Sequence, residues 1–212
     1  MTHALILVDV QNDFMPGGAL AVAQGDAIVP VANALLAADG LFDVVVATQD
    51  HHPAHHGSFA SQHPGHAPGE VIELHGLPQV LWPDHCVQDT PGAGFHPDLD
   101  MARVARVFPK GTDPAIDSYS GFYDNGHRKA TGMGAWLKER GVEHVTVLGL
   151  ATDYCVKFTA LDALKEGFEV RLVEDACRAV NLSPQDESDA LAQMRAAGVQ
   201  IVRSQDMLAP QI

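Results

Sequence analysis

The stretch “HVTVLGLATDYC”, residues 144–155, combines two local patterns. Its first part is mainly apolar and rich in β-branched residues, which is typical of a buried strand. The part that follows leads into an amphipathic segment over 153–166, which ends near Gly167, where a residue with a left-handed backbone is expected. The stretch therefore predicts a strand followed directly by a helix, with Cys155 at the beginning of that helix.

The same strand-then-helix unit recurs along the chain. Five further apolar runs are predicted strands, over 4–9, 42–48, 105–110, 168–175 and 199–204. Three further amphipathic segments are predicted helices, over 26–39, 130–140 and 186–197, and they end near Gly40, Gly141 and Gly198. Continuous apolar runs suit strands that are covered on both faces. We therefore predict an α/β fold, with one doubly wound, mostly parallel six-stranded sheet, helices on both faces and a Rossmann-type topology.

Residues 49–104 interrupt this pattern, because they are too rich in glycine, proline and histidine to be regular and are much longer than an ordinary connection. Long loops in compact domains usually carry function, so we expect this region to bind the substrate and a metal ion. The 212 residues, of which 46% are hydrophobic, suit a single core. The chain is thus predicted to form one domain over 1–212.

Composition limits the classes of partner. The net charge of −14 argues against nucleic acid and anionic membranes, because binding them needs clustered lysine and arginine. A small neutral or cationic molecule fits better. The opening “MTHALILVDVQNDF” matches neither a signal peptide nor a membrane span, so a cytoplasmic location is expected. The three cysteines, Cys86, Cys155 and Cys177, are an odd and sparse set that indicates free thiols.

Reactive side chains follow the predicted strands. Asp9, Lys110 and Cys155 lie at or just after the ends of three of them, and ligands of doubly wound sheets bind beyond those ends. Each residue alone has an ordinary explanation, as a turn residue, a solvated lysine or a small buried side chain. Together they predict a nucleophile, Cys155, a base, Asp9, and an electrostatic stabiliser, Lys110. We expect the helix start and Lys110 to lower the pKa of the Cys155 thiol.

The histidine-rich stretch “TQDHHPAHHGSF”, residues 48–59, is a candidate metal site. Asp50 and His52 are two positions apart, so an extended backbone points both side chains to one side. “WPDHC” adds His85, and one carboxylate with two imidazoles suits a divalent ion such as Zn²⁺, Fe²⁺ or Mn²⁺. His56 is a further candidate ligand. From these residues alone, a merely polar and flexible loop is an equally good interpretation.

Five motifs resemble those of the nicotinamidases, of the bacterial type also called pyrazinamidases, within the cysteine hydrolases similar to isochorismatase. They occur in the family's order from about residue 5 to 205: “LVDVQNDFMPGGAL”, “TQDHHPAHHGSFAS”, “LWPDHCVQDTPGAGFHP”, “FPKGTDPAIDSYSGFYDN” and “GLATDYCVKFTALDA”. The Asp50 and His52 pair combined with “WPDHC” is the more specific signal, because it supplies the metal. The resemblance implies an isochorismatase-like fold and hydrolysis of nicotinamide to nicotinate and ammonia, with pyrazinamide as a further substrate. It also implies a place in NAD salvage.

The resemblance implies roles for individual residues. Cys155 is the nucleophile that forms a thioester, Asp9 the general base and acid, and Lys110 the residue that polarises the triad. Asp50, His52 and His85 hold one divalent metal ion that positions the pyridine ring, with zinc as the first expectation and iron or manganese as alternatives. His56 is the least secure ligand, because family members differ at that position.

Further implied roles concern substrate binding. Phe14 and Trp82 sandwich the pyridine ring, and Tyr119 lies near it. The backbone N–H groups of Ala151 and Cys155 form the oxyanion hole, and the peptide bond between Leu150 and Ala151 is cis.

Two other functions stay open at this point. One is a sister hydrolase of the same superfamily that acts on a carbamoyl, ureido or vinyl ether substrate. The other is a non-catalytic metal-binding or scaffold protein that uses the histidine-rich loop. The sequence is compatible with a monomer or a homo-oligomer.

Overall fold

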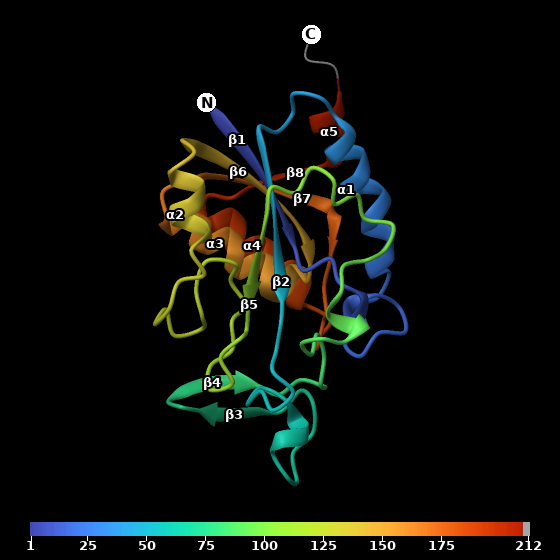
Figure 1. Ribbon diagram of the computed structural model, residues 1–212, viewed down its shortest axis with the longest axis vertical. Coiled ribbons are helices and arrows are strands. Elements are labelled where there is room, and N and C mark those ends of the chain that lie inside the picture. The colour runs from blue at the N-terminus through green and yellow to red at the C-terminus, as the bar shows by residue number, and fades with distance from the viewer. Residues whose placement is uncertain (210–212) are drawn as a thin grey trace.

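A single six-stranded sheet forms the centre of the computed structural model, which describes residues 1–209 (Figure 1). Its strands, in spatial order, are β5 (Arg106–Lys110), β2 (Val44–Asp50), β1 (Thr2–Val8), β6 (Val142–Leu150), β7 (Glu169–Arg178) and β8 (Gln200–Val202). All neighbouring strands in it are parallel. Counted along the chain, the order is 3-2-1-4-5-6, which is the doubly wound arrangement that the sequence predicted.

The helices lie on both sides of the sheet. They are α1 (Ile28–Ala37), α2 (Met133–Lys138), α3 (Lys157–Lys165), α4 (Asp186–Ala197) and α5 (Ser204–Leu208). Figure 1 shows α1 and α5 on one side of the strands and α2, α3 and α4 on the other. The four predicted glycine ends are confirmed, since Gly40, Gly141, Gly167 and Gly198 all have positive φ angles. The prediction missed α5.

The core is centred on β1 and β6, the two inner strands. Residues 4–8 of β1 have no exposed surface, which explains their unbroken apolar run. Each fully buried leucine or isoleucine there contributes about 1.5–3 kcal/mol through the hydrophobic effect. The two strands approach so closely that a Cβ at Gly149 would lie 2.0 Å from the Val8 carbonyl oxygen. Only glycine fits at that position.

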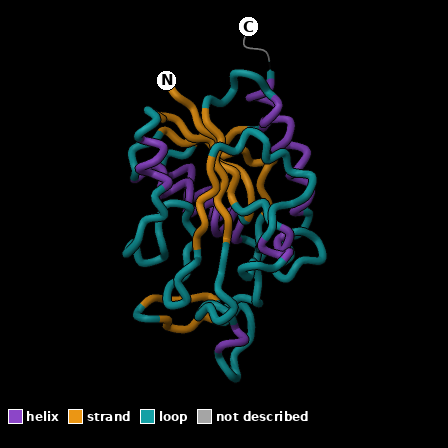
Figure 2. The backbone as a smooth tube through the Cα atoms, in the orientation of Figure 1, coloured by secondary structure: helices purple, strands orange, loops and turns teal. Residues whose placement is uncertain are grey.

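The region over 49–104 is less irregular than the sequence suggested. It contains an antiparallel hairpin of β3 (Val71–Leu74) and β4 (Leu77–Val80), with a short 3₁₀ turn on each side. Figure 2 shows the hairpin at the end of the molecule toward which β2 and β5 point. The expectation of a wholly irregular segment was therefore wrong. Within residues 1–209, none of the helices combines the length and the apolarity needed to cross a lipid bilayer.

One half-buried histidine at the start of β1, His3, predicts acid-sensitive stability. Burial, together with the nearby Arg171 and His144, lowers the pKa of His3 to about 4. An unfolded chain protonates this group below about pH 6.5, so stability is full above that pH and falls as the pH drops toward 4. We expect His3→Gln, which can keep the contact to Thr146, to flatten this decline in urea unfolding. An unchanged slope would contradict the assignment, and the same substitution at exposed His55 is the control.

Candidate active site

Three strand ends meet where the strand order reverses, between β1 and β6. Asp9 directly follows β1 and has a left-handed backbone, with φ of 48°. Lys110 is the last residue of β5. Cys155 lies in a single π-helical turn, Thr152–Val156, in which the Val156 N–H donates to the Ala151 carbonyl at 3.1 Å. The turn leads directly into α3, so the predicted convergence of these three residues at the carboxyl edge is confirmed.

Lys110 is the hub of the cluster. Its Nζ lies 2.8 Å from Asp9 Oδ2, 3.1 Å from Asp50 Oδ1 and 3.4 Å from Cys155 Sγ, and it donates to the Ser118 carbonyl at 2.9 Å. The contact with Asp9 Oδ2 is an ion pair between two side chains with no exposed surface. All four side chains, Asp9, Asp50, Lys110 and Cys155, are buried. One ammonium therefore pairs with two carboxylates and faces the thiol.

The protonation states follow from burial and from these charges. Burial raises the pKa of Asp9 and outweighs the opposite effect of Lys110. Burial also acts against ionised Asp50, but the charges of His52 and Lys110 hold the pKa of that carboxyl well below its usual range. Burial would lower the pKa of Lys110, yet Asp50 and Asp9 raise it well above its ordinary value. Lys110 and Asp50 are thus a charged pair.

The thiol differs from what the sequence suggested. Burial raises the pKa of Cys155 well above its ordinary value, and the nearby Asp9 and Asp50 carboxylates act in the same direction, against the opposite effect of Lys110. The expectation of a lowered thiol pKa was therefore wrong. A neutral thiol beside a carboxylate requires that its proton be removed during the attack rather than before it.

Two residues that the sequence did not single out position the carboxylates. The Thr48 hydroxyl donates to Asp9 Oδ1 at 2.6 Å. The Gln11 side-chain amide donates to the Asp50 carbonyl and accepts from the Asp50 N–H, both at 2.8 Å. These contacts hold the backbone of Asp50 as a neighbouring strand would. The signal for Gln11 was its place in “DVQNDF”, and Thr48 was a polar residue at the end of an apolar run.

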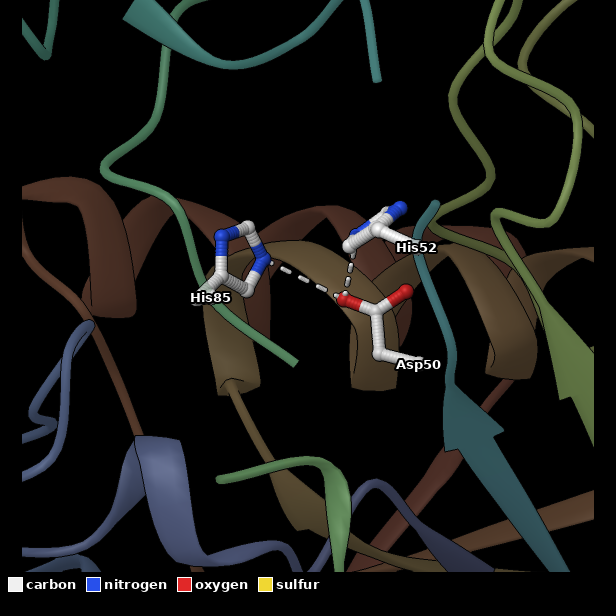
Figure 3. A group of neighbouring side chains, drawn as sticks. All are labelled: Asp50, His52 and His85. Atoms are coloured by element: carbon white, nitrogen blue, oxygen red, sulfur yellow. Dashed lines mark ion pairs between the residues drawn. The ribbon is translucent and has the colours of Figure 1, made fainter. Parts of the chain in front are cut away.

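Asp50, His52 and His85 form a compact group of metal donors (Figure 3). Asp50 Oδ2 lies 3.1 Å from His52 Nε2 and 3.3 Å from His85 Nε2, and both rings point toward it. The other ring nitrogen, Nδ1, contacts a backbone carbonyl in each case, Gly111 at 2.9 Å and Pro83 at 2.7 Å. A carbonyl only accepts, so each Nδ1 carries a proton, and in the neutral ring each Nε2 has the lone pair that a cation needs. This arrangement fits a divalent cation.

His56 lies beside this group but is held differently. Its Nε2 is buried without a hydrogen-bond partner among the described residues, and its ring is 4.3 Å from that of His52. Its Nδ1 accepts from the Ser58 N–H at 3.1 Å and lies 2.7 Å from the Ser58 hydroxyl. His52, His56 and Asp117 form a second group with metal-ligand spacing. Asp117 was not predicted, because its position depends on how the loop after β5 folds.

A cavity, here called the inner cavity, opens beside the thiol. It is lined by Phe14, Leu20, Asp50, Trp82, His85, Asp117, Tyr119, Ala151, Tyr154, Cys155 and Val180. All three predicted ring-binding aromatics are therefore present, and the metal donors and the thiol share the cavity with them. The predicted cis peptide bond between Leu150 and Ala151 is also present.

Fold and site together define an open α/β protein with a thiol, a carboxylate and an ammonium at its topological switch point. The family model of the isochorismatase domain matches residues 3–206. The nicotinamidase of Escherichia coli (strain K12) is 53% identical over 197 residues, which cover 92% of this chain and 92% of that protein.

Two solved structures extend the comparison. A nicotinamidase from Acinetobacter baumannii has a TM-score of 0.93 and 48% identity, and the match covers 97% of this chain and 98% of the other. A pyrazinamidase of Pyrococcus horikoshii in complex with zinc has a TM-score of 0.77 and 41% identity, with coverages of 96% and 99%. The chain belongs to the isochorismatase family and, within it, to the nicotinamidases.

Proposed function

We propose that the protein hydrolyses nicotinamide to nicotinate and ammonia through a thioester on Cys155, and that it also accepts pyrazinamide. The observation that carries this proposal is the inner cavity, in which one space is lined by the thiol, by two metal donors and by four aromatic rings. The full-length similarity to nicotinamidases supports the same substrate. By the same proposal the enzyme is cytoplasmic and serves NAD salvage.

We assign the whole chain, 1–212, to one hydrolase domain. In this proposal the region over 49–104 contributes the metal donors His52 and His85 and the ring-binding Trp82, while the strand ends contribute the reacting groups. Three of the eleven cavity-lining side chains, Trp82, His85 and Asp50, come from this region or from its boundary.

Asp50, His52 and His85 are the residues that would hold a divalent metal ion, with His56 as a fourth donor. Zinc is our first choice, because a related pyrazinamidase is described with it, and iron and manganese suit the same donors. When bound, the ion supplies a positive charge that fixes the orientation of the pyridine nitrogen. Phe14 and Trp82 would then pack against the two faces of the ring.

The chemical steps fall to the residues around Lys110. Asp9 accepts the thiol proton as Cys155 attacks the carboxamide carbon, and the charge that develops is stabilised by Lys110. The backbone N–H groups of Ala151 and Cys155 would hold the tetrahedral oxyanion, a contribution of about 3–4 kcal/mol per donor. Asp9 returns its proton to the leaving ammonia. It then deprotonates the water that hydrolyses the thioester.

The direct test is ammonia release from nicotinamide by the purified, metal-replete protein. Release at a rate well above the buffer background is the expected result. If no ammonia is released but a carbamoyl, ureido or vinyl ether compound is turned over, nicotinamide is not the substrate and the protein is a sister hydrolase.

Loss of a metal donor should weaken substrate binding more than it lowers the reactivity of the Cys155 thiol. We expect His52→Ala to lose most of its bound metal and to raise KM for nicotinamide at least about 10-fold, because the ring loses its orienting charge. Metal content by mass spectrometry and steady-state kinetics would measure the two effects. His63→Ala is the matched control, since His63 belongs to the same loop but to neither donor group. A variant with full metal content and unchanged KM would refute the ligand role of His52.

A further inference from the structure

A second cavity lies directly outside the inner one. This outer cavity has a volume of about 450 Å³ and is open to solvent. Its walls come from the β3–β4 hairpin, including Val71 and Val80, and from α3 and α4, including Phe158 and Ala190. Val71 and Phe158 are exposed to 64% and 37%, so the outer cavity has an unusually apolar surface for solvent-facing residues.

Two tyrosines line both cavities and therefore form the wall between them, Tyr119 and Tyr154. Contacts to both its hydroxyl and its ring hold Tyr119 in place. Its hydroxyl accepts hydrogen bonds from Trp82 Nε1 and Gln79 Nε2, both at 3.2 Å, and its ring stacks on Phe158 with centroids 5.5 Å apart. It is a rigid part of the wall.

Tyr154 closes the remaining part of the wall. Its ring meets Trp82 and Tyr119 edge to face, with centroid distances of 4.8 and 5.3 Å. Such contacts add packing to the wall but leave the ring free of stacking on either side. Since Tyr154 directly precedes Cys155, its backbone is fixed by the turn that carries the thiol. Truncation of its side chain would therefore join the two cavities without moving the nucleophile.

The orientation of the ring indicates which substituents would meet this wall. In the proposed binding mode the ring nitrogen faces Asp50 and His85, and the carboxamide faces Cys155. Both groups lie on one side of the ring, so the opposite carbon, C5, faces the rest of the lining. That remainder consists of Leu20, Asp117, Tyr119, Tyr154 and Val180, of which only Tyr119 and Tyr154 also line the outer cavity.

We propose that Tyr154 sets the upper size of the aromatic amides that the enzyme accepts, by closing the inner cavity against the outer one at ring position C5. The proposal rests on the proposed amidase function. The outer cavity is the space that a bulky C5 substituent would enter. Its lining carries three carboxylates, Asp153, Asp186 and Asp189, and one ammonium, Lys157, so neutral or cationic substituents fit it and anionic ones do not.

The test compares kcat/KM for nicotinamide and for 5-phenylnicotinamide. Wild type and Tyr154→Phe, which keeps the ring, should strongly favour nicotinamide. In Tyr154→Ala this preference should fall by about 100-fold, since the excluded group gains space. Phe158→Ala is the matched control, because it removes an aromatic ring from the outer cavity only. It should leave the preference within a factor of about three.

A binding measurement tests this inference independently of the proposed catalytic function. Calorimetry with 5-phenylnicotinate needs no turnover, and we expect Tyr154→Ala to bind it while wild type does not. This result would support the size limit set by Tyr154 even if wild type failed to hydrolyse nicotinamide. An unchanged preference and no binding in both Tyr154→Ala and Tyr154→Leu, with folding verified by thermal unfolding, would overturn the proposal. So would an equal gain in Phe158→Ala.

Discussion

Cys155→Ala is expected to reduce the turnover of nicotinamide at least about 10⁴-fold, because no other group can form the thioester. The variant keeps the aromatic walls and the metal donors of the inner cavity, so nicotinate should still bind. The substitution removes only one sulfur atom from a site that is 7% exposed. The measurement is ammonia release at saturating nicotinamide, beside nicotinate binding by calorimetry.

Cys177→Ala is the matched control for this experiment. Cys177 is as deeply buried, but it lies in β7 and takes no part in the lining of the inner cavity. We expect it to change kcat less than threefold, with a modest loss of stability from the small void. Retained turnover in Cys155→Ala would refute the assignment of Cys155 as the nucleophile. Loss of turnover in both variants would point to a general packing defect.

Lys110→Met is expected to have the second-largest effect, on both stability and activity. The substitution preserves much of the side-chain volume but leaves Asp9 and Asp50 without their common ammonium. Removing one partner of a buried ion pair costs about 3–5 kcal/mol. The free energy of unfolding in urea should fall by about that amount, and kcat should fall at least about 100-fold, because the thiolate loses its positive neighbour.

Lys138→Met separates this effect from the loss of any lysine. Lys138 pairs with Glu166 at the surface, and its side chain is 49% exposed. Exposed pairs contribute only about 0–1 kcal/mol, so this variant should keep nearly all of its stability and activity. Equal losses in the two variants would contradict the central position that the structure gives to Lys110.

The sheet could be predicted because its strands are buried on both faces. Runs such as 4–9 and 144–150 are mainly apolar, and glycine marks the ends of the helices between the strands. The β3–β4 hairpin was missed for the opposite reason. Its strands are half exposed and include Pro78, and they lie among residues whose composition indicates loops. Helix α5 has only five residues, too few for a periodic pattern.

The site was predictable where the topology alone brings residues together. Asp9, Lys110 and Cys155 follow from the rule that parallel strands end at one edge. The contact of Thr48 with Asp9 instead depends on the register that pairs Thr48 with Val8. The high pKa of the thiol also escaped prediction, because it depends on how completely Cys155 is buried and on how near Asp9 and Asp50 lie.

Asp50 divides its two oxygens between two tasks, and this limits how the enzyme can diverge. Oδ1 faces Lys110, and Oδ2 faces His52 and His85. Any replacement at this position damages both the reacting cluster and the cation site in a single mutational step. Evolution or design can therefore vary ion preference at the periphery, at His56 or Asp117, while the shared carboxylate stays fixed. The two halves of the centre share one side chain, so a descendant that loses the ion by replacing Asp50 must also rebuild the support of Lys110.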